Sequence, residues 1–151
     1  MADNTRGVEQ ALAAFTYNMN AIPFNLHAGF RLLSADASSA VLEFALKPEL
    51  IGNVHQQSLH GGVIAAAMDF AGGACGIVAA YAQVSPEERS ARLQRFGTID
   101  LQVEYLRPGR GKLFHTSATV LRAGNKLCVT RMQLHNDAEQ LIATATATYL
   151  F

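Results

Sequence analysis

The sequence predicts an α+β fold in which an antiparallel sheet wraps around one long central helix. Half of the 151 residues are hydrophobic and only 16% are charged, which suits one domain with a substantial core. A run of small apolar residues from Val63 to Ala82 has the length of a buried helix. After this run the apolar period changes to two, and the predicted strands follow one another across short turns, which favours antiparallel pairing.

The first third of the chain predicts one helix and two strands. Val8 to Met19 is mildly amphipathic and predicts a helix, which ends before a proline because proline disfavours helical angles in the preceding residue. Phe30 to Leu33 predicts a strand, and Ala40 to Leu46, with its apolar alternation, predicts a second. Lys47 to Leu59 predicts a polar connection to the central helix.

The central apolar run has the length of a membrane span, but Asp69 interrupts it and Ala and Gly dominate over Leu and Ile. A buried core helix is therefore the favoured interpretation. The sequence Ser85-Pro86-Glu87-Glu88 is typical of a helix start, so Pro86 to Phe96 predicts a short exposed helix.

The last third of the chain predicts four strands joined by turns. The expected strands are Ile99–Tyr105, Phe114–Leu121, Leu127–His135 and Leu141–Leu150. One sheet cannot cover a helix that is apolar nearly all round, so we expect a partner subunit on the far side of the helix.

Composition excludes several classes of function. The formal net charge is zero, with 12 basic and 12 acidic side chains, which argues against a general binder of nucleic acid or of a membrane surface. Cys75 and Cys128 lack metal-type spacing, and Met1 to Gly7 lacks the pattern of a signal peptide. We therefore expect a reduced, cytoplasmic protein with no metal and no bound cofactor.

The segment His60-Gly61-Gly62, followed by a helix that carries Asp69, holds the candidate chemistry. The first turn of a helix presents unpaired N–H groups, and the N–H of Gly61 could polarise a carbonyl as an oxyanion hole does. A carboxylate inside an apolar helix is costly unless it has a partner or a task. Each residue also has a simpler structural interpretation: Gly61 is needed only for close packing, and Asp69 is buried because structural hydrogen bonds satisfy it. Together, donor and carboxylate indicate hydrolysis of an activated acyl group.

Helix geometry separates these two groups. Gly61 and Asp69 are eight residues apart, which is about 12 Å along a helix axis. The two cannot touch the same reacting carbonyl. A site that uses both must take one of them from a second subunit.

The ordered set of motifs resembles the hotdog fold, and within it the acyl-CoA thioesterases of the phenylacetate-degradation type. The likeness covers about Phe24 to Phe151 and leaves 1–23 as an N-terminal helical segment. Ser85–Phe96 and the lead-in Gly52–Ser58 further resemble a bacterial subgroup that acts on medium- and long-chain acyl-CoA. The motifs that carry the resemblance are Leu59–Gly62 with Asp69, Gly97–Leu101, Tyr105–Gly109, Leu121–Lys126 and Ala143–Tyr149.

The resemblance implies a homodimer, or a dimer of dimers, in which Gly61 of one chain faces Asp69 of the other. His60 then positions the substrate or the glycine turn, with direct proton transfer as the alternative. In the family an Asn or Gln often stands six residues before this histidine, near the nucleophilic water. Val54 stands there in this sequence, so Asn53 or Gln57 is expected to take that role.

Two further features follow from the resemblance. The family often carries Ser or Thr four residues after the acid, where this chain has Gly73, so that hydroxyl must come from elsewhere or be absent. Coenzyme A carries phosphates, and basic turns are expected to bind it, although solvated charges at hairpin tips are an equal alternative. The expected coenzyme A residues are Gly62, Arg107, Arg110, Arg122, Asn125 and Lys126.

The sequence thus predicts hydrolysis of acyl-CoA to free acid and coenzyme A, with Asp69 as base or as nucleophile. Small residues along the helix favour aliphatic acyl chains over hydroxylated aromatic rings, and the resemblance to the bacterial subgroup implies chains of medium to long length. Hydration or dehydration of acyl thioesters is a less favoured activity, because Asp69 is the helix's lone acid and no histidine accompanies it. A non-catalytic acyl-CoA binding protein is the alternative from another class.

Overall fold

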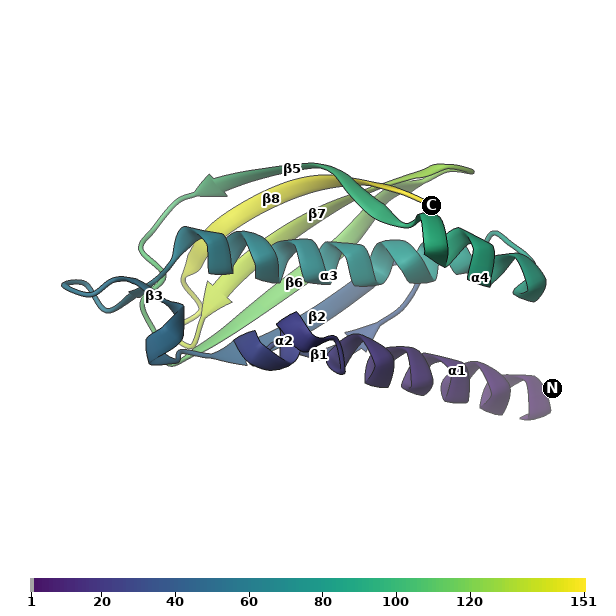
Figure 1. The fold of residues 1–151 in the computed structure, drawn as a ribbon, viewed down its shortest axis with the longest axis horizontal. Helices are drawn as coiled ribbons and strands as arrows, with labels where there is room; N and C mark the ends of the chain where they lie inside the picture. The colour runs from purple at the N-terminus through teal and green to yellow at the C-terminus, as the bar shows by residue number, and fades with distance from the viewer. Residues whose placement is uncertain (1) are drawn as a thin grey trace.

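A computed structural model describes the backbone of residues 2–151 and the side chains of these residues except 2–10 and 86. One curved six-stranded antiparallel sheet wraps around the helix α3 (Gly61–Tyr81), which confirms the predicted α+β hotdog architecture (Figure 1). The strand order is β1-β2-β6-β7-β8-β5. The strands are β1 (Arg31–Ala35), β2 (Ser39–Ala45), β5 (Gly97–Tyr105), β6 (Leu113–Ala123), β7 (Leu127–Asn136) and β8 (Leu141–Leu150).

Most predicted elements appear within a few residues of their expected bounds. The short exposed helix is α4 (Pro86–Arg95), and the Ser85 N–H donates a hydrogen bond of 3.3 Å to the Glu88 side chain at its start. The polar connection is more ordered than expected. It contains the 3-10 turn η1 (Pro48–Leu50) and a small hairpin of β3 (Ile51–Asn53) and β4 (Ser58–Leu59).

A second N-terminal helix, α2 (Pro23–Ala28), was also not predicted. The proline that ends α1 (Ala2–Asn20) occupies the first turn of α2, where its missing N–H has no helical partner to lose. Gly29 ends α2 in the left-handed conformation, at φ 75°.

The helix α3 lies in the core. It is long and apolar enough to cross a membrane, but most of it is buried inside this fold. Its small residues let the sheet approach closely: a Cβ atom at Gly72 would lie 2.5 Å from the Tyr149 hydroxyl on β8. The sequence interpretation of a core helix is therefore confirmed.

The N-terminal helices cover part of the face of α3 that the sheet leaves open. The Asn20 side chain joins the end of α1 to the edge strand β1, because its Oδ1 accepts from the Leu32 N–H at 2.6 Å and its Nδ2 donates to the Leu32 carbonyl at 3.1 Å. Phe15 and Met19 pack against the core. The sequence analysis expected a partner subunit on this side of α3, and α1 and α2 provide part of the cover.

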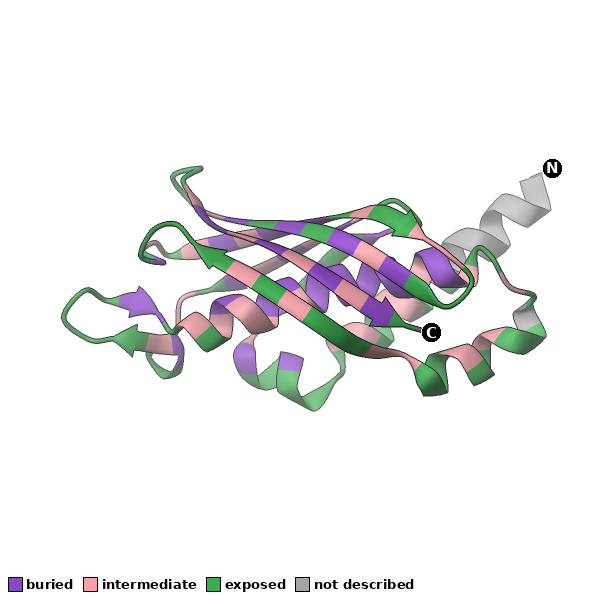
Figure 2. Cartoon of the chain, turned by 90° about the horizontal axis from the view of Figure 1, so that it is seen from above, coloured by how far each residue is buried: buried purple, intermediate pink, exposed green. Residues whose placement is uncertain are grey.

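The strand β5 forms one edge of the sheet and pairs with β8 along one side. Most of its residues are exposed, and Ile99 and Tyr105 are each more than half exposed. Figure 2 shows the contrast between this exposed edge and the buried positions that alternate along the inner strands. A nine-residue edge strand with open N–H and C=O groups is a template for pairing with another chain.

Candidate active site

The first turn of α3 leaves one backbone donor free. His60 caps the helix: its Nδ1 accepts a hydrogen bond of 2.9 Å from the Gly62 N–H. The Val63 N–H donates to the His60 carbonyl at 2.9 Å. The Gly61 N–H has no acceptor within the described part of the chain. Of the two glycines, Gly61 is therefore the one whose N–H is available to a ligand.

Tyr105, at the end of β5, holds this turn from the outside. Its hydroxyl donates a hydrogen bond of 3.0 Å to the Gly61 carbonyl, and its ring would lie 3.4 Å from a Cβ atom at Gly61. Both residues line a groove of about 380 Å³, together with Gln56 and Arg107. The sequence analysis placed Tyr105 at the end of a strand and in the motif Tyr105–Gly109, but nothing in the sequence marked it as a neighbour of Gly61.

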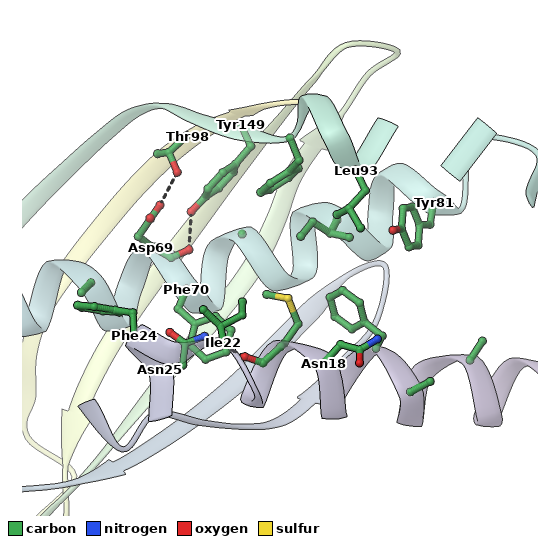
Figure 3. Close-up of a pocket in the computed structure, with 18 residues that line it drawn as sticks. Asn18, Ile22, Phe24, Asn25, Asp69, Phe70, Tyr81, Leu93, Thr98 and Tyr149 are labelled. Atoms are coloured by element: carbon green, nitrogen blue, oxygen red, sulfur yellow. Dashed lines mark hydrogen bonds between the residues drawn. The ribbon is translucent and has the colours of Figure 1, made fainter. Parts of the chain in front are cut away.

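Asp69 lies two helical turns further along α3 and is half-buried. The Thr98 hydroxyl, at the start of β5, donates a hydrogen bond of 2.9 Å to Asp69 Oδ1 (Figure 3). The Tyr149 hydroxyl donates to the Asp69 carbonyl at 3.0 Å. Burial raises the pKa of the Tyr149 phenol, which keeps it a proton donor at neutral pH. These bonds fix both the carboxylate and the backbone at Asp69.

Asp69 lines a cavity of about 700 Å³ that also has residues of α1 and α2 in its walls, and its carboxylate points towards Thr98 (Figure 3). Apart from Asp69, Thr98 and a few other polar groups, its walls are aliphatic and aromatic, with Phe70 and Phe96 among them. A carboxylate at the edge of an apolar cavity is an arrangement that suits attack on an acyl group with a hydrocarbon tail.

Within one chain, the Gly61 turn and the Asp69 carboxylate border two separate hollows. The groove beside Gly61 and the cavity beside Asp69 have no lining residue in common. The two are anchored at opposite ends of one strand, by Tyr105 and Thr98 respectively.

The predicted amide side chains lie in the β3–β4 hairpin. Asn53 Oδ1 accepts hydrogen bonds of 3.1 Å from the N–H groups of His55 and Gln56. Gln57 Nε2 donates to the Val54 carbonyl at 2.8 Å. Both amides therefore stabilise the hairpin tip, and neither lines the cavity of Asp69 in the same chain. Their proposed place near the reacting water stays a prediction.

The structure separates the predicted basic residues into two clusters. Arg107 follows the end of β5 and donates a hydrogen bond of 2.9 Å to the Leu141 carbonyl, with the exposed Arg110 in the same turn. Arg122, Asn125 and Lys126 surround the β6–β7 turn, which the strand register places at the other end of the sheet, level with the start of β5.

Arg92 of α4 also belongs to the second cluster, and the sequence analysis did not predict this residue. Arg92 donates hydrogen bonds to the carbonyls of Asn125 and Phe151. Arg95, Asn125 and Lys126 line a hollow there. Among the described side chains, no three His, Cys, Asp or Glu residues lie close enough to hold a metal ion.

Comparison with known protein families matches residues 56–143 to the thioesterase superfamily. The chain belongs to this superfamily, and it is a thioester hydrolase with the hotdog fold. It is 45% identical over 149 residues, 94% of each chain, to the medium/long-chain acyl-CoA thioesterase YigI of Escherichia coli K12.

Solved structures agree with this assignment. A Shewanella oneidensis protein related to the thioesterase superfamily superposes with a TM-score of 0.89 at 40% identity, over 94% of this chain and 95% of that one. A structure from Syntrophus aciditrophicus superposes with a TM-score of 0.84 at 34% identity, over 96% and 98% of the two chains.

Proposed function

We propose that this protein hydrolyses medium- and long-chain acyl-CoA to the free acid and coenzyme A. The observation that carries the proposal is the Asp69 carboxylate, held by Thr98 at the edge of an apolar cavity of about 700 Å³. Similarity to YigI, named for this activity, supports the substrate class. Coenzyme A is part of the substrate, and the reaction as proposed needs no further cofactor.

Asp69 supplies the attack on the thioester carbonyl in one of two ways. As a base, it takes a proton from water while the water oxygen bonds to the carbonyl carbon. As a nucleophile, it bonds to that carbon itself, and water then hydrolyses the resulting anhydride. In the base route the C–S bond then breaks, and the coenzyme A sulfur takes the proton that Asp69 removed from water. In the nucleophile route the C–S bond breaks as the anhydride forms, and the departing thiolate takes up a proton released when water hydrolyses that anhydride. The Gly61 N–H stabilises the negative charge that develops on the carbonyl oxygen.

A homodimer would bring together the Gly61 turn of one chain and the Asp69 carboxylate of the other. Pairing of β5 with the β5 of a second copy about a two-fold axis is antiparallel, so the start of one strand meets the end of the other. Thr98 with its Asp69 would then lie near the partner's Tyr105 with its Gly61. The exposed edge of β5 supports this arrangement, which gives two identical sites per dimer.

The remaining predicted residues take supporting roles. His60 positions Gly61, because its ring already accepts the Gly62 N–H. In an antiparallel dimer the Arg122–Lys126 turn of one chain lies towards the Arg107 end of the other, so both basic clusters border one site and suit the phosphates of coenzyme A. Two buried free cysteines are compatible with work in a reducing cytoplasm.

Release of free thiol from a panel of acyl-CoA substrates, measured for wild type and Asp69→Asn together, tests the proposal. Asn keeps the size of the side chain and its bond to Thr98 but is neither base nor nucleophile. We expect kcat to fall by about 10² or more with an unchanged thermal midpoint. Full activity in the folded variant, or no turnover of any acyl-CoA by wild type, would overturn it.

Complementation between subunits tests the shared site. Asp69→Asn homodimers and Gly61→Pro homodimers should each be nearly inactive, since both of their sites lack one component. Random mixing makes half of the dimers mixed, and each mixed dimer has one intact site of two, so about a quarter of wild-type activity should return. No recovery in demonstrably mixed dimers would contradict sharing across the two-fold axis.

A further inference from the structure

We propose that α1 and α2 form one wall of the tunnel that holds the acyl chain, and that Tyr81 closes its far end and sets the longest chain accepted. This inference rests on the proposed function and concerns the tail of the substrate, away from the reacting carbonyl. It assigns a specificity role to the N-terminal segment, which no catalytic motif touches.

Two facing stripes of small and apolar side chains build the tunnel. On α3 the stripe recurs at helical spacing, with Phe70, Gly73, Ile77 and Tyr81 on one face. On α1 the matching stripe includes Ala14, Phe15 and Met19. The helices run in opposite directions: in Figure 3, Ile22 and Asn25 lie towards Phe70, and Asn18 lies towards Tyr81. The cavity follows α3 away from Asp69.

Hydrogen bonds hold the N-terminal wall in place. Asn20 bonds both the N–H and the carbonyl of Leu32 on β1. The buried Asn25 donates a hydrogen bond of 2.9 Å from Nδ2 to the Met19 carbonyl, which ties α2 to the end of α1. The wall is therefore attached at one end to β1, the sheet edge opposite β5.

The far end of the tunnel is closed by Tyr81 with support from α4. The Arg89 guanidinium lies 5.8 Å from the centroid of the Tyr81 ring, a cation–π distance. Leu93 and Phe96, at the end of α4 and just beyond it, also line the cavity there. The segment between α3 and β5 thus has a structural reason to be present: it positions the ring that ends the tunnel.

The length of the tunnel gives an expected chain length. Asp69 and Tyr81 are twelve residues apart on α3, or about 18 Å at the rise of an α-helix. Carbon–carbon bonds of about 1.5 Å advance an extended chain by about 1.3 Å per carbon, so the tunnel holds about 14 carbons. Apolar burial should raise kcat/KM by about fourfold per methylene until the chain reaches Tyr81.

Matched substitutions on neighbouring residues of α1 test the wall. Both alanines are exposed, but only Ala14 lines the cavity, and it lies one helical turn before Asn18, which is on the Tyr81 side of the cavity in Figure 3. We expect Ala14→Trp to lower kcat/KM for dodecanoyl-CoA and longer substrates by at least about tenfold and to leave butyryl-CoA within about twofold. Ala13→Trp should leave the whole profile unchanged.

A second variant tests whether the position of a substitution along the tunnel sets the acyl-chain length that is accepted. A side chain at Gly73 starts in ordinary contact with Tyr149 and Phe96, at 3.5 and 3.6 Å from its Cβ, and extends into the cavity one turn beyond Asp69. In Gly73→Leu, kcat/KM should therefore begin to fall at a shorter acyl chain than in Ala14→Trp, and the loss should already be present with octanoyl-CoA. Equal profiles for Ala14→Trp and Ala13→Trp, or the reverse order of cut-offs, would overturn the proposed tunnel.

Binding of dodecanoate, measured by titration calorimetry, separates this inference from the proposed function. Dodecanoate should bind wild type and Ala13→Trp equally, and Ala14→Trp at least about tenfold more weakly. This result supports the tunnel even if no acyl-CoA is hydrolysed. Absence of binding to wild type, or equal binding by all three proteins, refutes the tunnel even if Asp69-dependent hydrolysis is observed.

Discussion

The hydroxyl of Thr98 donates a hydrogen bond of 2.9 Å to the carboxylate of Asp69, across 29 residues of sequence. The family pattern offers a hydroxyl four residues after the acid, where this chain has Gly73. Here β5 supplies a hydroxyl instead. The exchange leaves the helix position free of a side chain, and that space belongs to the cavity. One strand residue thus orients the acid while the helix stays open.

Removal of the Thr98 hydroxyl should impair the reaction without unfolding the protein. Thr98→Val keeps the shape of the side chain and leaves Asp69 without its donor, and a hydrogen bond to a charged group contributes about 1.5–3 kcal/mol. We expect kcat to fall by about tenfold or more, with KM little changed. Thr98→Ser should recover most of the rate. Equal activity for the Val and Ser variants would show that the hydroxyl has no positioning role.

A proline in place of Gly61 should delete the proposed oxyanion donor and preserve the helix. Proline is well tolerated in the first turn of a helix, and the preceding His60 already has the extended angles that proline requires, φ −64° and ψ 137°. We expect kcat to fall by about 10² to 10³. Gly61→Ala, which retains the N–H, is the control. Near-wild-type turnover by a folded Gly61→Pro protein would assign the donor elsewhere.

Periodicity predicted most of the fold because the relevant signals are local. The β8 strand (Leu141–Leu150) has the predicted bounds, and α3 ends one residue before its predicted end. The helix α2 was missed because Pro23 was interpreted only as the end of a helix, although proline also favours a helix start. The β3–β4 hairpin was missed because its strands of three and two residues are too short to show a period.

The site was predictable to the extent that its residues share one motif. Gly61 and Asp69 lie on one helix, so the sequence places them and their separation together. Thr98 and Tyr105 contact them through tertiary packing of β5; both belong to motifs that carry the family resemblance, but no local pattern pairs them with Asp69 and Gly61. The cavity wall from α1 was also invisible, because the position of that helix depends on Asn20 and β1 rather than on any pattern within it.

Cys75 and Cys128 should be inert to thiol reagents in the native protein. Both are fully buried, and desolvation raises the pKa of the Cys75 thiol to about 12 and raises that of Cys128 as well. At pH 8 we expect no labelling by a disulfide reagent until denaturant is added, when both thiols should react. Prompt labelling of the folded protein would show that the core opens readily.

The same pKa shift makes stability fall in alkali. The unfolded Cys75 thiol ionises near its ordinary pKa of 9, and the folded thiol only near 12. Its contribution is therefore complete below pH 9 and is lost as the pH rises towards 12, by up to about 1.4 kcal/mol per pH unit. Urea midpoints at pH 8 to 11 should fall more steeply for wild type than for Cys75→Ala. Parallel curves would contradict this account.

The adjacent glycines Gly72 and Gly73 should differ in how well they tolerate alanine. A Cβ at Gly72 would lie within 2.8 Å of three side-chain atoms of the sheet, including the Tyr149 hydroxyl, whereas a Cβ at Gly73 meets its nearest neighbour at 3.5 Å. Overpacking of this kind costs about 1–3 kcal/mol, and relief of helical glycine contributes about 0.5–1 kcal/mol.

We therefore expect Gly72→Ala to lower the thermal midpoint by several degrees and Gly73→Ala to keep or raise it. Since the displaced Tyr149 hydroxyl also bonds the Asp69 carbonyl, Gly72→Ala should lower kcat on butyryl-CoA, a substrate too short to report on the tunnel, and Gly73→Ala should not. Equal thermal midpoints for the two variants would mean that Tyr149 can move away from the new methyl group without a loss of stability.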